Sequence, residues 1–452
     1  MSTLAVGVVN SSYSKGIAST VTFGSPVTRH PGVVTELPAG TNLSSDPRVL
    51  AFMHGTNERA MIASYTYATP PSVGSATFGV YAPTTTGSWG SPIATATTSG
   101  GTNNWGISNP WGLVSIDKYL YIQDYDSNNI AIVDMASGYT LAGTISNVFT
   151  GYDSGKTPHG SGMDVYSFDD PDTLTTVYVL AALYNQSDSS YTYGNSGLVL
   201  IRVDGTTATT IGTIITLTKN ATSVTVEADS ASGNFYAYVT AMGGMQTAGG
   251  NGSASTVQAV TLPNTVSGGI YTPTLALLNT VTAMTSPSTF GDFNDIEFWD
   301  SNAYILGSNY DSSYSTYTYR LIRVAAASLR SGSFSGSSNT GALTSTPAGA
   351  TWLLAPANDT LWLVDGNFVH NVPAGTLSSG STPFGSATAD ATDGTSSGVG
   401  LGTSDVNGNL NTASVVIDRT ATRTRSGKPA TAVSRSKMAL TAEELKRRTG
   451  KK

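Results

Sequence analysis

Residues 110–145 constrain the fold most strongly, because four short apolar segments follow one another there with turn-forming residues between them. The segments are Leu113–Ile116, Tyr119–Ile122, Ile130–Val133 and Thr140–Ile145. Asp, Asn and Gly separate them, and β-branched or aromatic runs with such separators are typical of antiparallel strands joined by hairpins. Four strands in about 36 residues match one blade of a β-propeller. The segment therefore predicts an all-β chain built from repeats of this unit.

The rest of the chain repeats the pattern. Residues 178–203 and 304–324 share Tyr-x-Leu, a loop rich in Tyr and Ser, and a final Leu-Ile-Arg-Val. Such repetition favours a repeat fold over unrelated domains. We expect a β-propeller over 1–418, most simply with seven four-stranded blades and with six or eight as alternatives, followed by a basic C-terminal extension, 419–452. The blades are expected at 44–98, 109–145, 159–217, 222–280, 288–332, 348–378, and 398–418 closed by the N-terminal strands of 1–24.

One blade also carries a nameable pattern. It reads NPWGL at 109–113, LYIQD at 120–124 and NNI at 128–130. This resembles the NHL/YVTN-type propeller repeat, in which Pro-x-Gly precedes a strand and Tyr-Val-x-Asp and Asn-x-x-Ile follow. The other units lack the Pro-x-Gly or the Asp. The resemblance implies a propeller with a binding or scaffolding role, and it does not imply one chemistry.

Composition excludes several classes of site. The chain has no cysteine, so it can form neither a disulfide framework nor a thiolate metal site. Its four histidines fall in no metal-binding spacing, and no phosphate-binding or nucleophile-elbow motif occurs, so we expect no metal and no cofactor. No apolar stretch is long enough to span a membrane. The N-terminus lacks a signal-peptide pattern, so either a signal was removed or the protein assembles without crossing a membrane.

The charge is distributed unevenly. Residues 1–418 contain 11 basic and 27 acidic residues, a net charge of −16, whereas 419–452 contain 11 basic and two acidic residues, a net charge of +9. The extension could bind a polyanion such as nucleic acid, dock on an acidic surface of its own or a neighbouring copy, or remain a disordered end. We favour docking on a neighbouring subunit. The basic residues expected to act are Arg419, Arg423, Arg425, Lys428, Arg435, Lys437, Lys446, Arg447 and Arg448. A short helix is expected at 440–448.

The loops that lead into the first strand of each blade carry the candidate ligand-binding residues. Aromatic rings stack on sugars, and carboxamides and carboxylates hydrogen-bond to hydroxyl groups. The candidates are Trp105, Asn109, Trp111, His159, Asp164, Asp292, Asn294 and Asp295. The alternative is that the tryptophans pack between blades and that the Asp and Asn side chains cap turns.

Two groups of carboxylates raise the question of catalysis. Asp292, Asp295 and Glu297 form one group, and Asp124 and Asp126 the other. Glycosidases need two carboxyl groups at a controlled separation, which a sequence does not give. We therefore assign no catalytic residue from the sequence.

These observations favour a non-catalytic structural or binding propeller. Its low charge, 11% Asp, Glu, Lys and Arg, and its long polar loops suit a cell surface, an extracellular assembly or a virion. The expected partner is a second copy or another surface protein, reached through 419–452. A glycan is a further candidate ligand, and nucleic acid could bind only through the extension. The alternative is a secreted carbohydrate-active enzyme, a glycoside hydrolase or lyase that uses carboxylates of the funnel.

Overall fold

The computed structural model shows an all-β chain whose strands form antiparallel and mostly four-stranded sheets, as in a β-propeller. It describes residues 3–10, 15–22, 28–36, 47–66, 74–84, 89–170, 175–190, 192–229, 231–243, 255–264, 277–282, 292–299, 301–310, 317–334, 338–339, 343–344, 354–357, 360–365, 368–373, 408–418 and 433–438. No helix in this part of the chain is long and apolar enough to cross a membrane.

Three four-stranded sheets follow chain order. The first comprises β4 (Pro47–His54), β5 (Asn57–Thr66), β6 (Ser75–Tyr81) and β7 (Ala94–Thr97). The second comprises β12 (Thr157–Asp169), β13 (Thr176–Ser187), β14 (Ser196–Asp204) and β15 (Thr207–Leu217). The third comprises β16 (Ala221–Ala228), β17 (Phe235–Ala241), β18 (Thr256–Leu262) and β19 (Leu277–Thr282).

Two further sheets are built in the same way. One comprises β20 (Asp292–Trp299), β21 (Asn302–Tyr310), β22 (Tyr317–Ala325), β23 (Ser338–Asn339) and β24 (Leu343–Thr344). The other comprises β25 (Leu354–Ala357), β26 (Thr360–Asp365) and β27 (Phe368–Pro373). Helix α1 (Ala326–Arg330) follows β22 directly.

A nine-stranded sheet joins the two ends of the chain, in the order β11-β10-β9-β8-β29-β28-β1-β2-β3. One part of it is the four-stranded unit expected from residues 110–145, with β8 (Pro110–Ile116), β9 (Tyr119–Asp124), β10 (Asn129–Asp134) and β11 (Thr140–Ser146). The remaining strands are β1 (Thr3–Asn10), β2 (Lys15–Thr22), β3 (Thr28–Glu36), β28 (Gly408–Asp418) and β29 (Val433–Met438).

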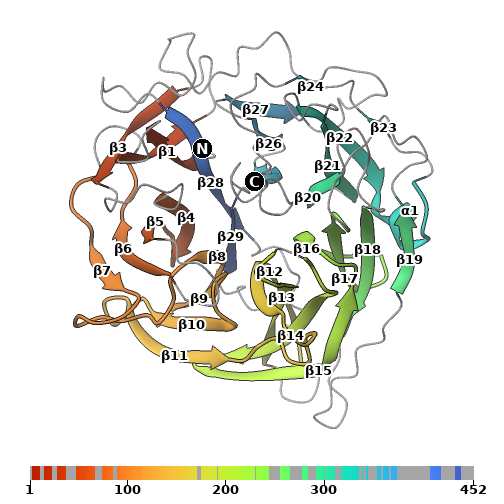
Figure 1. The fold of residues 1–452 in the computed structure, drawn as a ribbon, viewed down its shortest axis with the longest axis horizontal. Coiled ribbons are helices and arrows are strands. Elements are labelled where there is room, and N and C mark those ends of the chain that lie inside the picture. The colour runs from red at the N-terminus through yellow and green to blue at the C-terminus, as the bar shows by residue number, and fades with distance from the viewer. Residues whose placement is uncertain are drawn as a thin grey trace.

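Figure 1 shows the sheets arranged around a common centre, with β4, β12, β16 and β20 each nearer to it than the other strands of its own sheet. Burial follows this arrangement in the unit β8–β11, because every residue of β8 is buried while β11 is mostly exposed. The inner strand β8 is covered on both faces, and the outer strand faces water. The centre of the ring is therefore formed by the inner strands.

The N-terminal strands complete a unit begun by the C-terminal part of the chain. Strand β1 pairs antiparallel with β28, with Leu4 opposite Val415 and Val8 opposite Leu410. This pairing joins an N-terminal strand to a strand within the region 398–418. Strand β29 was not expected, because the sequence predicted no strand within 419–452. The helix predicted at 440–448 lies outside the described residues.

Polar side chains connect neighbouring sheets. The buried Gln123 of β9 donates through Nε2 to the Leu183 carbonyl at 2.9 Å and accepts from the Gly162 backbone at 2.9 Å. Asn185 of β13 contacts the next sheet in the same way. Its Oδ1 accepts from the Ala221 backbone N–H at 2.8 Å, and its Nδ2 donates to the Ala221 carbonyl at 2.7 Å. Since each amide satisfies backbone groups of the neighbouring sheet, these contacts fix the register between sheets as well as their distance.

Candidate functional site

Two neighbouring carboxyl groups, those of Asp124 and Asp126, lie where β9 ends and the turn to β10 begins. Asp124 is opposite Pro110, the first residue of β8. The pair therefore lies at the end of the sheets at which β8 begins, which we call the site face. Turn residues gather here because the Asp, Ser and Asn side chains of 124–128 favour chain reversal.

Asp124 is fully buried and has a perturbed pKa. Its Oδ1 accepts hydrogen bonds from the backbone N–H groups of Ser108 (3.2 Å) and Asn109 (2.7 Å), and its Oδ2 accepts one from the Ser127 hydroxyl (2.7 Å). Desolvation and the nearby Asp126 raise the pKa of Asp124 to about 7, because they outweigh the three hydrogen bonds that stabilise the ionised form. Asp124 thus titrates near neutral pH, where a general acid or base operates.

Asp126 is half-buried and bridges two sheets. Its Oδ2 accepts from the Tyr65 hydroxyl at 2.8 Å and from the Ser108 hydroxyl at 3.0 Å, and its Oδ1 accepts from Asn109 Nδ2 at 3.3 Å. Tyr65 belongs to β5, so the carboxyl pair lies at the junction of the sheets β4–β7 and β8–β11. All three partners donate hydrogen bonds to its carboxyl oxygens.

An aromatic stack adjoins the pair. The ring of Tyr125, between the two acids in sequence, lies 5.3 Å from that of Trp111 and stacks on His159 at 4.8 Å and 21°. His159 Nε2 lies 3.1 Å from the Ser187 hydroxyl, and its Nδ1 lies 3.3 Å from the Tyr125 carbonyl. The imidazole is therefore held in one orientation, and it links the carboxyl pair to the sheet β12–β15.

Three of the residues predicted from sequence, Asn109, Trp111 and His159, meet at this site. Trp105 lies apart from this site: it is buried, lies against Phe78 (4.9 Å between ring centroids) and donates through Nε1 to the Tyr139 carbonyl at 3.0 Å. Trp111 is buried as well, so both tryptophans fit the packing alternative.

Other predicted residues make contacts within and between sheets. Asp164 accepts from the backbone N–H of Val226 at 2.7 Å, which ties β12 to β16. Glu297 is buried and accepts from the Thr225 hydroxyl at 2.7 Å, which ties β20 to β16. Asp295 is buried and accepts from the Ile296 backbone at 2.9 Å. In the structure these three carboxylates accept hydrogen bonds from protein donors of their own and neighbouring sheets.

Two sets of predicted residues remain. The side chain of Asp292 lies outside the described residues. The basic residues of the extension also lie outside the described residues, apart from the backbones of Arg435 and Lys437, which belong to β29. Asn294 is 1% exposed, and neither its Oδ1 nor its Nδ2 has a hydrogen-bond partner among the described residues.

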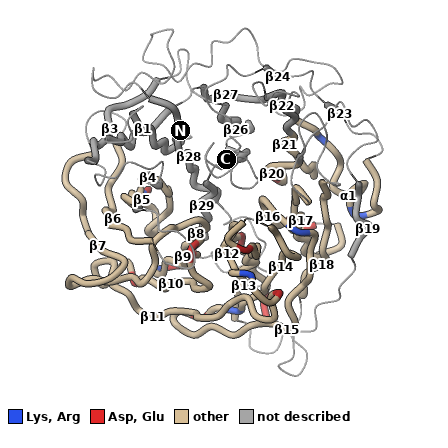
Figure 2. The backbone as a smooth tube through the Cα atoms, viewed as in Figure 1, with Lys and Arg blue, Asp and Glu red and all other residues tan. Residues whose placement is uncertain are grey.

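Sequence reasoning did not select Tyr65, Ser108 and Ser127, which complete the site. Single hydroxyl residues carry no spacing signal, and Tyr65 reaches Asp126 from another sheet. The signal that was available lay in the turn DYDSN at 124–128, where two acids flank an aromatic residue. Figure 2 shows acidic residues near β8, β9 and β12. Among the described residues no group of three or more His, Asp or Glu side chains could hold a metal ion.

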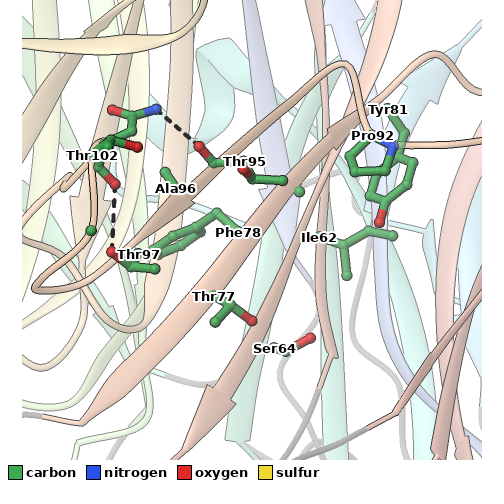
Figure 3. A pocket seen from close by; sticks show the side chains of 13 residues that line it. Ile62, Ser64, Thr77, Phe78, Tyr81, Pro92, Thr95, Ala96, Thr97 and Thr102 are labelled. Carbon is green, nitrogen blue, oxygen red and sulfur yellow. Dashed lines mark hydrogen bonds between the residues drawn. The ribbon is translucent and has the colours of Figure 1, made fainter.

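A separate cavity of about 450 Å³ lies on the sheet β4–β7. Tyr81 and Pro92 lie at one end and Thr97 and Thr102 at the other, with Ser64 and Thr77 between them (Figure 3). Its described lining combines hydroxyl groups and the Asn103 amide with apolar side chains such as Ile62 and Phe78, and it includes no Asp, Glu, His, Lys or Arg. The cavity can therefore hydrogen-bond a neutral polar molecule, but it supplies no proton donor or acceptor for acid–base chemistry near neutral pH.

Comparisons with known proteins show a likeness of fold. No protein-family model and no curated relative matches the chain. Similar solved structures include a 6-phosphogluconolactonase candidate from Bacteroides fragilis NCTC 9343 (12% identity, TM-score 0.33, covering 70% of this chain and 90% of that one). They also include apo AztD from Citrobacter koseri (10%, 0.33, 85% and 97%) and the polysaccharide lyase Uly1 (10%, 0.39, 90% and 92%).

These comparisons correct two sequence interpretations. The NHL/YVTN resemblance at 109–134 is matched by no family model, and only the coarser resemblance to propeller-like all-β proteins holds. The prediction of a non-catalytic structural or binding protein finds no support in these comparisons: two of the similar structures are named for lactonase and polysaccharide lyase activity, and those names describe those proteins.

Proposed function

We propose that the protein is a carbohydrate-active enzyme that cleaves a glycosidic bond at the Asp124–Asp126 pair. The observation that carries this proposal is the pairing of two carboxyl groups in unlike environments, one fully buried with a pKa of about 7 and one half-buried among three donors. When unlike environments push the pKa values of two neighbouring acids apart, one acid can act as proton donor and the other as proton acceptor. Hydrolysis and β-elimination of a glycoside both need these two roles.

The buried acid has a route to the surface through Ser127. The Ser127 hydroxyl donates to Asp124 Oδ2. On this proposal the bond reverses when Asp124 is protonated: the carboxyl proton then points to the Ser127 oxygen, and the hydroxyl proton of the half-buried Ser127 turns outward. Transfer of that proton to the glycosidic oxygen leaves Asp124 ionised. Asp126 accepts the second proton, from water in hydrolysis or from the sugar carbon in elimination. Solvent then returns both groups to their starting states.

The neighbouring aromatic groups support the acids in this proposal. Tyr125 stacks on His159 and lies at a tilt beside Trp111, and all three side chains are buried, so they pack against the turn that carries Asp124 and Asp126. Asn109, Ser108 and Tyr65 hold Asp126 in place, so their substitution should impair turnover through geometry.

We also propose that the ring is closed by seven units. Support comes from the nine-stranded sheet, which contains β8–β11 and β28-β1-β2-β3 as two four-stranded units joined by β29, in addition to the five other sheets. On this proposal residues 1–418 form one propeller.

The experiment incubates the purified protein with neutral and uronate-containing polysaccharides, and follows both reducing ends and ultraviolet absorbance of unsaturated products. Reducing ends alone indicate hydrolysis, and new absorbance indicates elimination. Asp126→Asn should lower kcat by at least about 100-fold. Asp204→Asn is the matched control, because Asp204 is an exposed carboxylate at the end of β14. Equal rates for the two variants, or no turnover of any polysaccharide, would overturn the proposal.

A further inference from the structure

The cavity on the sheet β4–β7 is lined by side chains that share one face of that sheet. Residues paired across neighbouring strands point to the same face, and neighbouring strands lie about 4.7–4.9 Å apart. The pairing of β5, β6 and β7 places two rows along the cavity, namely Ser64, Thr77 and Thr97 in one row and Ile62, Gly79 and Thr95 in the other. Hydroxyl groups therefore recur across the sheet at the spacing of its strands.

Gly79 creates the hollow between these rows. A Cβ at this position would lie 2.7 Å from Cε2 of Tyr81, so the Tyr81 ring lies over the glycine. That ring packs in a buried cluster with Trp89, whose ring centroid is 6.0 Å away. Figure 3 shows Tyr81 beside Pro92 at one end of the cavity. A larger residue at position 79 would displace the ring, so the shape of the cavity depends on this glycine.

The opposite end of the cavity is held in place by Asn103. Its Nδ2 donates to the Thr95 carbonyl at 3.0 Å, drawn in Figure 3, and to the Tyr139 carbonyl at 2.9 Å. Its backbone carbonyl accepts from the Thr97 backbone N–H at 3.0 Å. Because these bonds fix the segment 98–104 against β7, a ligand would meet a wall that is already formed and would pay little to order it.

The polar groups of the cavity select a class of ligand. Thr77, Thr95 and Thr102 are exposed, and each hydroxyl can both donate and accept. A carboxylate or phosphate would lose water here without gaining a counter-charge from the described lining. A purely apolar ligand would cover the hydroxyl groups without bonding them. The volume of about 450 Å³ lies within the range of about 300–1,000 Å³ usual for small-molecule sites.

We propose that this cavity is a secondary binding site for a neutral saccharide, whose hydroxyl groups bond the two threonine-bearing rows while its C–H groups contact Pro92. The site lies on the other side of the strand that reaches the carboxyl pair, because Ser64 lines the cavity and the next residue, Tyr65, donates to Asp126 at 2.8 Å. A saccharide in the cavity is thus separated from the carboxyl pair by the sheet. The inference goes beyond the proposed function and does not depend on it, because a site can hold a saccharide that the protein does not cleave.

The experiment is isothermal titration calorimetry with the full-length protein. The probes are tetrasaccharides of glucose, mannose, galactose and xylose, with tetragalacturonate as the charged counterpart. We expect at least one neutral tetrasaccharide to bind at least about tenfold more tightly than tetragalacturonate, with the same affinity at low and high salt. If no neutral tetrasaccharide binds, the inference is overturned.

Two variants locate the binding. Thr77→Val combined with Thr95→Val removes two exposed hydroxyl groups and keeps the shape of the side chains, so it should weaken the binding of the neutral tetrasaccharide at least about tenfold at an unchanged melting temperature. Thr144→Val is the matched control, because Thr144 is an exposed threonine of the outer strand β11 and does not line the cavity. Equal binding by the wild type and the double variant would overturn the inference, and so would equally tight binding of tetragalacturonate that the double variant also weakens.

The two proposals fail separately. Binding of a neutral tetrasaccharide without turnover of any polysaccharide would contradict the proposed function and leave this inference standing. Turnover of a polysaccharide together with unchanged binding by the double variant would leave the proposed function standing and overturn this inference.

Discussion

Replacing Asp124 with asparagine should stabilise the protein above pH 7 and abolish its activity. The introduced carboxamide can imitate the protonated acid, since its oxygen accepts from the backbone N–H groups of Ser108 and Asn109 while its NH₂ donates to Ser127. The variant keeps the hydrogen bonds and removes a charge that burial and Asp126 disfavour. It also removes the transferable proton.

The magnitude follows from the pKa. Asp124 has a pKa of about 7 in the folded chain against the ordinary 3.8. Between those values the folded state binds more protons than the unfolded state, so the free energy of unfolding falls as pH rises from about 4 to about 7 and is constant above. Three pKa units correspond to about 4 kcal/mol, an upper bound for this group. The stability difference between Asp124→Asn and the wild type should therefore grow by up to about 4 kcal/mol between pH 4 and pH 8.

Urea unfolding at intervals of one pH unit measures this difference, because other titrating groups cancel between the two proteins. The reasoning is refuted if the variant is less stable than the wild type at pH 8. That outcome would mean that the three donors hold Asp124 ionised in the folded state, and the assignment of a buried proton donor would fail with it.

Further predictions concern the supports of the site and of the ring. Arg330→Met should destabilise the protein by about 3 kcal/mol in urea unfolding, because it leaves the buried carboxylate of Glu227, 2.6 Å from Arg330 Nη1, without its cation; a variant as stable as the wild type would contradict this. Gly160→Ala should lower the free energy of unfolding by about 1–3 kcal/mol, because a Cβ at this position would lie 2.6 Å from the Asp124 carbonyl oxygen. Gly138→Ala is the control: a Cβ there meets no atom, so only the positive φ of residue 138 opposes the substitution. Tyr65→Phe should lower kcat more than it raises KM, because it removes a donor to Asp126 while leaving the ring in place. Deletion of 419–452 should lower the melting temperature, unlike deletion of 439–452, because it removes β29 from between β8 and β28.

The strands were predictable because each carries its own local signal. The four strands expected within 110–145 are β8 to β11, and the alternation of apolar runs with Asp, Asn and Gly turns was sufficient to place them. Strand β29 was missed for the opposite reason. Its residues VSRSKM have the polar, basic composition of the segment around them, and it becomes a strand only because two inner strands offer free edges on either side.

The site was partly predictable. Asn109, Trp111 and His159 were found because they precede or begin inner strands, where ligand-binding residues gather. The roles of Asp124 and Asp164 could not be separated by sequence, since both are acids beside apolar strands. Their difference lies in which protein groups surround them: Asp124 adjoins a second carboxyl group, and Asp164 bonds the backbone of Val226.

The pairing of β1 with β28 sets an order of events during synthesis. Strand β1 spans residues 3–10 and its inner partner spans 408–418, so about 400 residues must be made between them. At roughly 5–20 residues per second, the first strands wait about 20–80 s with an unpaired edge. During that interval the nascent chain offers a template for pairing with other chains, and β1 finds its partner only after residues 408–418 have left the ribosome. Expression of this protein should therefore depend more on how the early strands are shielded than on the stability of the finished ring.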